Sequence, residues 1–133
     1  QKDCVVGLHY HLFQADYWYI SSGTARIVLH DLRAESPTNG ATISMDLGLQ
    51  IDGSHNHTGV YIPPGVAHGF GALTDMTINY LVDNYYNPSD ELGVAWDDPE
   101  ISADWGIEVP TLSERDQNNP QRGKIQSDLK PRR

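Results

Sequence analysis

The sequence has few positive charges. Nine Lys and Arg residues stand against eighteen Asp and Glu residues in 133 positions, which gives a formal net charge of -9. A protein that binds nucleic acid needs positive surface to release counterions from the phosphates, so this balance excludes a general nucleic-acid binder. The cations are also unevenly placed, because none lies between Arg33 and Arg115. A ligand that carries phosphates therefore has few cations to choose from.

Cysteine and long apolar runs are scarce as well. Cys4 is the single cysteine, so no disulfide can form within the chain, and a cytoplasmic location is expected. No apolar run approaches the ~20 residues of a membrane span. The chain opens without a signal-peptide pattern. It starts at Gln1 rather than Met, from which we expect the native start to lie upstream.

The length fits one domain, which we assign to residues 1–123. Residues 124–133 have few apolar side chains and several basic ones. A segment of that composition buries little surface, so we expect a basic C-terminal tail that is mobile.

Short strand-like runs separated by turns predict an all-β fold. Apolar and polar side chains alternate over 24–32 and 41–47. β-Branched and aromatic residues fill further short runs at 4–10, 17–20, 58–62 and 76–82. Helical periodicity is confined to 112–117. Short strands at regular spacing are typical of a sandwich or a barrel.

Histidine and tyrosine supply the candidate chemistry. His9 and His11 are two residues apart, so in a strand they project to the same face. His68 follows the rigid turn 63–67, which fixes where its ring points. Tyr80 lies among apolar neighbours, so we expect its hydroxyl to have a partner in the interior. Each of these residues has an alternative interpretation as a hydrogen-bonded structural residue.

Six motifs occur in one order along residues 5–120. They are Gly7-Leu8-His9-Tyr10, Asp31-Leu32-Arg33 with Ser36-Pro37-Thr38, Tyr61 to Phe70, Tyr85-Tyr86-Asn87-Pro88, Trp96-Asp97-Asp98-Pro99 and Leu112 to Asp116. Together they resemble the dTDP-4-dehydrorhamnose 3,5-epimerase family. The resemblance implies a cupin-type jelly-roll barrel with a short C-terminal helical or extended segment. It also implies a homodimer without metal or other cofactor that acts on nucleotide-linked 4-keto-6-deoxy sugars in deoxysugar biosynthesis.

The resemblance also implies roles for particular side chains. His9 is similar to the family's general base, and Asp116 to the acid that orients it. Tyr80 matches the proton donor on the opposite face of the sugar. The remaining positions are expected to contact substrate: His68 at the sugar ketone, Tyr86 on the thymine ring, and Glu91 and Arg115 at the nucleotide. Such a set suits epimerisation, which removes a proton beside a ketone and returns one to the other face.

Three positions depart from the family pattern. Val6 stands where the family has an arginine that binds the diphosphate. Asp16 stands where it has a lysine that stabilises the enolate, and Leu81 replaces a lysine after the donor tyrosine. The family's N-terminal third is also missing. These departures leave open a slower enzyme, a single-centre epimerase, a related isomerase, or a non-catalytic cupin that binds a sugar nucleotide or a protein partner.

A second hypothesis comes from the same residues. His9, His11, Asp16 and His68 resemble the metal-binding cupin pattern, and imidazoles with a carboxylate suit Zn, Fe, Ni or Mn. A metal on His9 conflicts with its use as a free base. A hybrid holds the metal with His11, Asp16 and His68, as a Lewis acid in place of the lost lysine. Alternatively, His11 is a neutral replacement for the family's glutamine.

Overall fold

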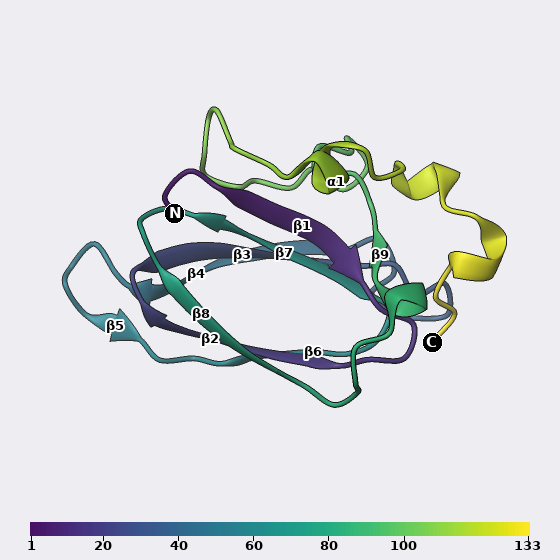
Figure 1. Ribbon diagram of the computed structural model, residues 1–133, viewed down its shortest axis with the longest axis horizontal. Coiled ribbons are helices and arrows are strands. Elements are labelled where there is room, and N and C mark those ends of the chain that lie inside the picture. Colours follow the sequence, from purple (N-terminus) through teal and green to yellow (C-terminus); the bar gives the residue numbers. More distant parts are fainter.

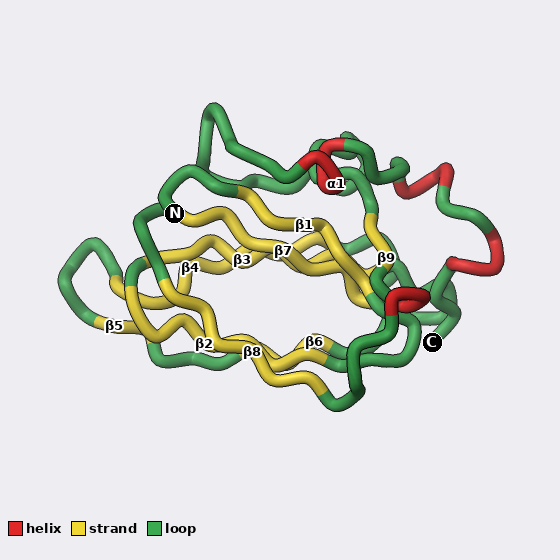
Figure 2. The backbone as a smooth tube through the Cα atoms, viewed as in Figure 1, coloured by secondary structure: helices red, strands yellow, loops and turns green.

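The computed structural model describes residues 1–133 and is built almost entirely from strands (Figures 1 and 2). The strands are β1 (Val5–Tyr10), β2 (Asp16–Ser22), β3 (Thr24–Asp31), β4 (Thr42–Leu49), β5 (His55–Asn56), β6 (Val60–Ile62), β7 (Val66–Ala72), β8 (Thr77–Val82) and β9 (Leu92–Gly93). The helical turns are η1 (Pro88–Asp90), α1 (Glu114–Gln117), η2 (Arg122–Lys124) and η3 (Ser127–Leu129). None of these helices has the length and apolar character needed to cross a bilayer.

The strands form two antiparallel sheets that face each other. The larger sheet has the order β5-β4-β3-β7-β1-β9, and the smaller has the order β6-β2-β8. Apolar side chains from both sheets, such as Ile20, Ile27 and Ile62, pack together between them. The predicted all-β class is confirmed. Figure 1 shows the two layers, with β1, β3 and β7 on one side and β2, β6 and β8 on the other.

The larger sheet is covered on its outer face too. Leu8 and Val28 on that face pack against Val94, Ile101 and Trp105, which come from the long segment after β9. Adjacent residues of β3 therefore enter different cores, Ile27 the inner one and Val28 the outer one. The sheet that carries the first histidines is thus fixed from both sides.

Strand β7 lies at the centre of the larger sheet, between β3 and β1, where the sequence predicted only the turn 63–67 followed by His68. Its residues from Val66 to Ala72 are all buried except Phe70, which is half-buried, so alternation is absent. A strand covered on both sides loses the period-two signal. Gly69 and Gly71 weaken its propensity further. Gly69 is needed there because a Cβ would lie 2.8 Å from the Trp105 ring.

The C-terminal segment 124–133, which the composition predicts to be a mobile tail, lies against the domain. Ile125 is 6% exposed and belongs to the outer core. The main-chain N–H groups of Ala34 and Glu35 donate to the carbonyls of Pro131 and Arg132, at 3.0 and 2.9 Å. Its mobility in solution stays a prediction.

Candidate active site

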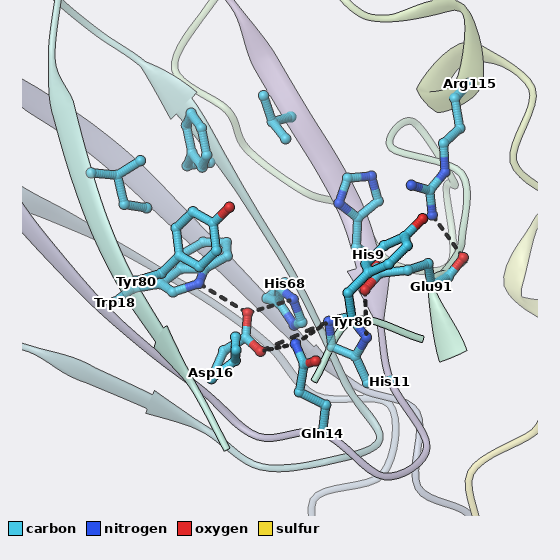
Figure 3. Close-up of a pocket in the computed structure, with 14 residues that line it drawn as sticks. His9, His11, Gln14, Asp16, Trp18, His68, Tyr80, Tyr86, Glu91 and Arg115 are labelled. Atoms are coloured by element: carbon cyan, nitrogen blue, oxygen red, sulfur yellow. Dashed lines mark hydrogen bonds and ion pairs between the residues drawn. The ribbon is translucent and has the colours of Figure 1, made fainter. Parts of the chain in front are cut away.

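A pocket of about 530 Å³ opens between β1 and β7 of one sheet and β2 and β8 of the other (Figure 3). His9 and His11 both line it, as their two-residue spacing predicts. The pocket brings together most of the predicted site residues: His9, His68, Tyr80, Tyr86, Glu91 and Arg115. Asp116 does not line the pocket but lies against His9.

His9 and Asp116 form a close pair. The His9 Nε2 atom lies 2.6 Å from Oδ1 of Asp116, whose side chain is 3% exposed. Because a buried ionised carboxylate can only accept, Nε2 carries the proton and Nδ1 is left with the lone pair. A carboxylate beside an imidazole fixes its tautomer and stabilises its protonated form. The pair therefore has the composition and geometry of a general base.

Asp116 is held in place from two directions. Ser113 caps α1, and its hydroxyl accepts the Asp116 N–H at 3.1 Å. The N–H of Gly7 donates to Asp116 Oδ2 at 3.2 Å. Gly7 has a φ of +123°, and a Cβ there would lie 2.8 Å from the Gly69 Cα atom. Strand β1 thus carries the imidazole and also anchors the carboxylate that serves it.

Tyr80 reaches the pocket from β8, on the side opposite His9 (Figure 3). The expectation that its hydroxyl has a partner in the interior is wrong. The side chain is 63% exposed, and its hydroxyl makes no hydrogen bond within the chain. The reason is that β8 is an edge strand of the smaller sheet. The hydroxyl is consequently free to contact a ligand in the pocket.

Three predicted substrate contacts come from separate segments near the pocket mouth. Arg115 Nη2 donates to the main-chain carbonyl of Glu91 at 2.7 Å, which ties α1 to the segment after η1. The Tyr86 ring is 76% exposed and lines the pocket. An open aromatic ring can stack on a flat base. Arg115 is the one Lys or Arg among the lining residues.

Two of the positions that depart from the expected pattern, Val6 and Leu81, lie differently with respect to the pocket. Val6 lines the pocket, so an apolar side chain occupies that part of the wall. Leu81 is outside the pocket and 72% exposed, because it alternates with Tyr80 along β8. The substitution at 81 therefore leaves the pocket chemistry unchanged, whereas the one at 6 removes polarity from it.

Asp16 lies at the pocket floor between two histidines. Its Oδ1 is 3.8 Å from Nε2 of His11, and its Oδ2 is 3.7 Å from Nε2 of His68. All three side chains are buried. Of the four residues in the metal hypothesis, the structure brings together these three. His9 is outside the group, since its Nε2 is occupied by Asp116.

Both histidines of this cluster are oriented by main-chain carbonyls. His68 Nδ1 donates to the Val66 carbonyl at 2.9 Å, and His11 Nδ1 donates to that of Asp90 at 2.7 Å. In a neutral ring that donates through Nδ1, the lone pair lies on Nε2. Burial lowers the pKa of His68 to about 4, so this ring is neutral at pH 7.

Sequence reasoning missed three residues that build this floor. Gln14 donates to Asp16 Oδ1 at 2.8 Å, and the Trp18 indole N–H donates to Oδ2 at 3.2 Å. Asp90 accepts the N–H groups of Leu12 and Phe13, at 2.6 and 3.1 Å. The alternation of Asp16 and Trp18 in β2 was a usable signal. The Asp90 contacts span 78 and 77 positions and have no local signature.

Comparison with known proteins identifies the family that this chain resembles. Residues 1–123 match the family described as dTDP-4-dehydrorhamnose 3,5-epimerase. The chain belongs to this family. It is 39% identical over 108 residues to the spore coat polysaccharide biosynthesis protein SpsL of Bacillus subtilis, covering 78% of this chain and 68% of that protein. It is 33% identical over 121 residues to the dTDP-4-dehydrorhamnose 3,5-epimerase of Shigella flexneri, covering 88% and 64%.

A solved structure shows the same fold. The dTDP-6-deoxy-D-glucose-3,5-epimerase RmlC of Legionella pneumophila, in complex with dTDP-4-keto-L-rhamnose, superposes with a TM-score of 0.88 at 31% identity. The match covers 100% of this chain and 70% of that one. The predicted family and the cupin-type fold are confirmed. The chain spans about two thirds of the length of these relatives.

Proposed function

We propose that this chain inverts a carbon beside the ketone of a dTDP-linked 4-keto-6-deoxyhexose, at C3, C5 or both. The observation that carries the proposal is the pair formed by His9 on β1 and Asp116 on α1, opposite the free hydroxyl of Tyr80 on β8, with one pocket between them. Inversion needs this arrangement, because the proton must leave one face of the sugar and return to the other. The family membership supports the choice of substrate class.

In this reaction His9 Nδ1 takes the proton from the carbon beside the ketone. The C–H electron pair forms the enolate double bond, and the negative charge moves to the ketone oxygen. Asp116 stabilises the imidazolium that forms. A proton from the Tyr80 hydroxyl then adds to the opposite face of the carbon, and the electron pair on oxygen restores the ketone. Proton exchange with solvent resets both side chains.

The nucleotide is proposed to lie toward the pocket mouth. Tyr86 offers its exposed ring to the thymine, and Arg115 and Glu91 stand beside it. His68 is proposed to lie at the sugar ketone. Its Nε2 presents a lone pair rather than a proton, however. It cannot by itself donate a hydrogen bond to the developing enolate oxygen.

Proton exchange with deuterated water tests the proposed function. The chain is mixed with dTDP-4-keto-6-deoxyglucose in D2O, and NMR follows loss of the C3 and C5 proton signals. We expect exchange at one centre or both. His9→Ala should slow it by at least about 100-fold, because general bases contribute on the order of 10² to 10⁴. His57→Ala serves as the control, since His57 is an exposed histidine outside the pocket.

The outcomes separate the alternatives that the sequence left open. Exchange at C3 alone identifies a single-centre epimerase. Calorimetric binding of the nucleotide sugar without exchange at either centre refutes the proposal and identifies a non-catalytic binding protein. Equal exchange by His9→Ala and the wild type would remove His9 from the mechanism.

A homodimer is part of the same proposal, supported by the family resemblance. Light scattering on the purified chain should give twice the 14.8 kDa of one copy. A mass of one copy at micromolar concentration would contradict it.

A further inference from the structure

The cluster at the pocket floor brings hydrogen-bond acceptors together. Each ring donates through Nδ1, so in the neutral form the Nε2 atoms of His11 and His68 carry lone pairs, and both face oxygens of Asp16 at less than 4 Å. His68 Nε2 makes no hydrogen bond. Gln14 approaches His11 Nε2 at 3.4 Å, which is a long contact. Gln14 and Trp18 each donate one hydrogen bond to the carboxylate, and a cation between the carboxylate and the two lone pairs would stabilise all three buried acceptors.

The separations suit a metal ion. The three ligand atoms lie within 4.8 Å of one another. Around a tetrahedral ion with bonds of about 2.0–2.1 Å, ligand atoms lie about 3.3 Å apart. The two contacts, 3.8 Å to Oδ1 and 3.7 Å to Oδ2 of Asp16, exceed this by about half an ångström. Small movements of the three side chains toward one another therefore bring them to bonding distance of one ion.

The surrounding contacts are those of a metal site. A histidine ligand commonly donates its other ring nitrogen to a carbonyl, which fixes the tautomer and the ring orientation. Val66 and Asp90 supply those carbonyls here. The Trp18 indole N–H holds the carboxylate from behind at 3.2 Å. Gln14 has to rotate away from His11 when an ion enters, and its amide oxygen then becomes available to the ion or to water.

From these contacts we infer that His11, Asp16 and His68 bind one divalent first-row transition metal ion at the pocket floor. Two imidazoles and one carboxylate leave coordination positions open. Because the three residues line the pocket, those positions are accessible to a ligand there. His9 stays outside the coordination sphere and remains free to act as a base.

The consequence for catalysis rests on the proposed function. The pocket has Val6 and Asp16 where its family has cations, and the neutral His68 cannot donate to the enolate oxygen. A metal ion held by Asp16 supplies positive charge at that point, as a Lewis acid for the ketone oxygen. The Asp16 substitution then changes the kind of cation rather than abolishing it.

Zinc binding tests the inference without any assay of activity. The chain is stripped with EDTA, dialysed, and titrated with Zn²⁺ by calorimetry, and the bound metal is counted by mass spectrometry. We expect one ion per chain. Cobalt in place of zinc should give visible d–d absorption that reports low-symmetry nitrogen and oxygen ligation. Absence of stoichiometric uptake by the folded, stripped protein overturns the inference.

Single substitutions locate the ion. Asp16→Asn and His11→Gln should each weaken zinc binding by at least about 100-fold, because loss of outer-shell partners alone costs about 10- to 100-fold. The matched control is the double variant His55→Gln with His57→Gln. These two rings stack with their centroids 4.1 Å apart and form the second pair of neighbouring histidines in the chain. Binding lost in the control but kept in His11→Gln would move the ion to that pair and refute the site. Should Asp16→Asn fail to fold, His11→Gln decides.

The two proposals fail separately. Zinc bound by wild type but not by His11→Gln, with no proton exchange in either, keeps the metal site and rejects the epimerase. Proton exchange that is equal in stripped protein with and without added zinc, with no zinc bound in either sample, does the reverse. If both stand, removal of zinc should slow exchange by at least about 10-fold while the affinity of the pocket for dTDP stays within about twofold.

Discussion

At the scale of single residues, the base and the acid of the proposed reaction stand in unlike environments. The imidazole of His9 is backed by a carboxylate that is 3% exposed. The phenol of Tyr80 is open to the pocket and 63% exposed. Removal of the anchored base and removal of the solvent-accessible acid are therefore expected to affect proton exchange and inversion differently.

Tyr80→Phe should separate exchange from inversion. His9 can still remove the proton and, after exchange with D2O, return deuterium to the same face of the carbon. We expect NMR to show incorporation of deuterium with little or no epimer. Tyr85→Phe, a 98% exposed neighbour outside the pocket, is the control and should behave like the wild type. Epimer formed at the normal rate by Tyr80→Phe would exclude it as the proton donor.

Asp116→Asn should disable the base without removing it. An asparagine can keep the Gly7 hydrogen bond through its oxygen while its NH2 group donates to His9 Nε2. The proton then moves to Nδ1, and the wrong tautomer faces the substrate. We expect exchange to fall by about 10² to 10⁴-fold, with thermal stability nearly unchanged.

The control for this substitution lies on the same short helix. Glu114→Gln replaces an exposed carboxylate two residues away and should leave exchange unaltered. Full activity in Asp116→Asn would show that the carboxylate contributes structure only.

At the scale of elements, β3 carries a buried histidine whose protonation opposes folding. His30 is 1% exposed; its Nδ1 bonds to the Thr42 hydroxyl at 2.8 Å, and its Nε2 has no partner. Burial lowers its pKa, as does the charge of Arg122, against opposing contributions from Asp31 and Asp98. Protonation would place a second N–H in the interior with no acceptor.

The sign of the pH dependence follows from the lowered pKa. Below about pH 6.5 the unfolded chain takes up a proton at His30, whereas the folded chain does so only at a lower pH. The free energy of unfolding should therefore fall as the pH drops from 7 to 5, and His30→Gln should reduce that slope. Urea unfolding at several pH values measures both. Parallel curves for the two proteins would contradict the assignment.

The strands also show what sequence could and could not predict. Alternation of apolar and polar residues in the sequence located β3 and β4, although β3 buries side chains on both faces, Ile27 in the inner core and Val28 in the outer one. It failed for β7, which is buried on both sides and in which no such alternation occurs. The His9 spacing predicted a shared face with His11, but nothing local joins His9 to Asp116, which the family resemblance alone suggested. Gln14 and Asp90 were missed because their partners are set by the folded chain.

At the scale of the whole molecule, the segment after β9 closes the outer core. Ile125 belongs to that core, and Tyr10 donates to the Leu129 carbonyl at 3.1 Å. Ile125→Ala should lower the free energy of unfolding by about 2–4 kcal/mol, the usual cost of a buried isoleucine. Ile51→Ala is the control, because that side chain is fully exposed and should change stability by less than about 0.5 kcal/mol.

The same experiment decides how the C-terminal segment behaves in solution. If residues 124–133 move freely, as their composition predicts, Ile125→Ala will match the control. Hydrogen exchange at the amides of Ala34 and Glu35 gives a second measure, since both donate to this segment. Slow exchange at both positions indicates a docked segment.

The bond between His9 and Asp116 joins residues 107 positions apart. During synthesis β1 leaves the ribosome well before α1, which follows only after both sheets have been made. A nascent chain can therefore assemble its barrel while its imidazole still lacks the carboxylate. Translation that stalls before residue 116 would yield a folded shell with an incomplete dyad.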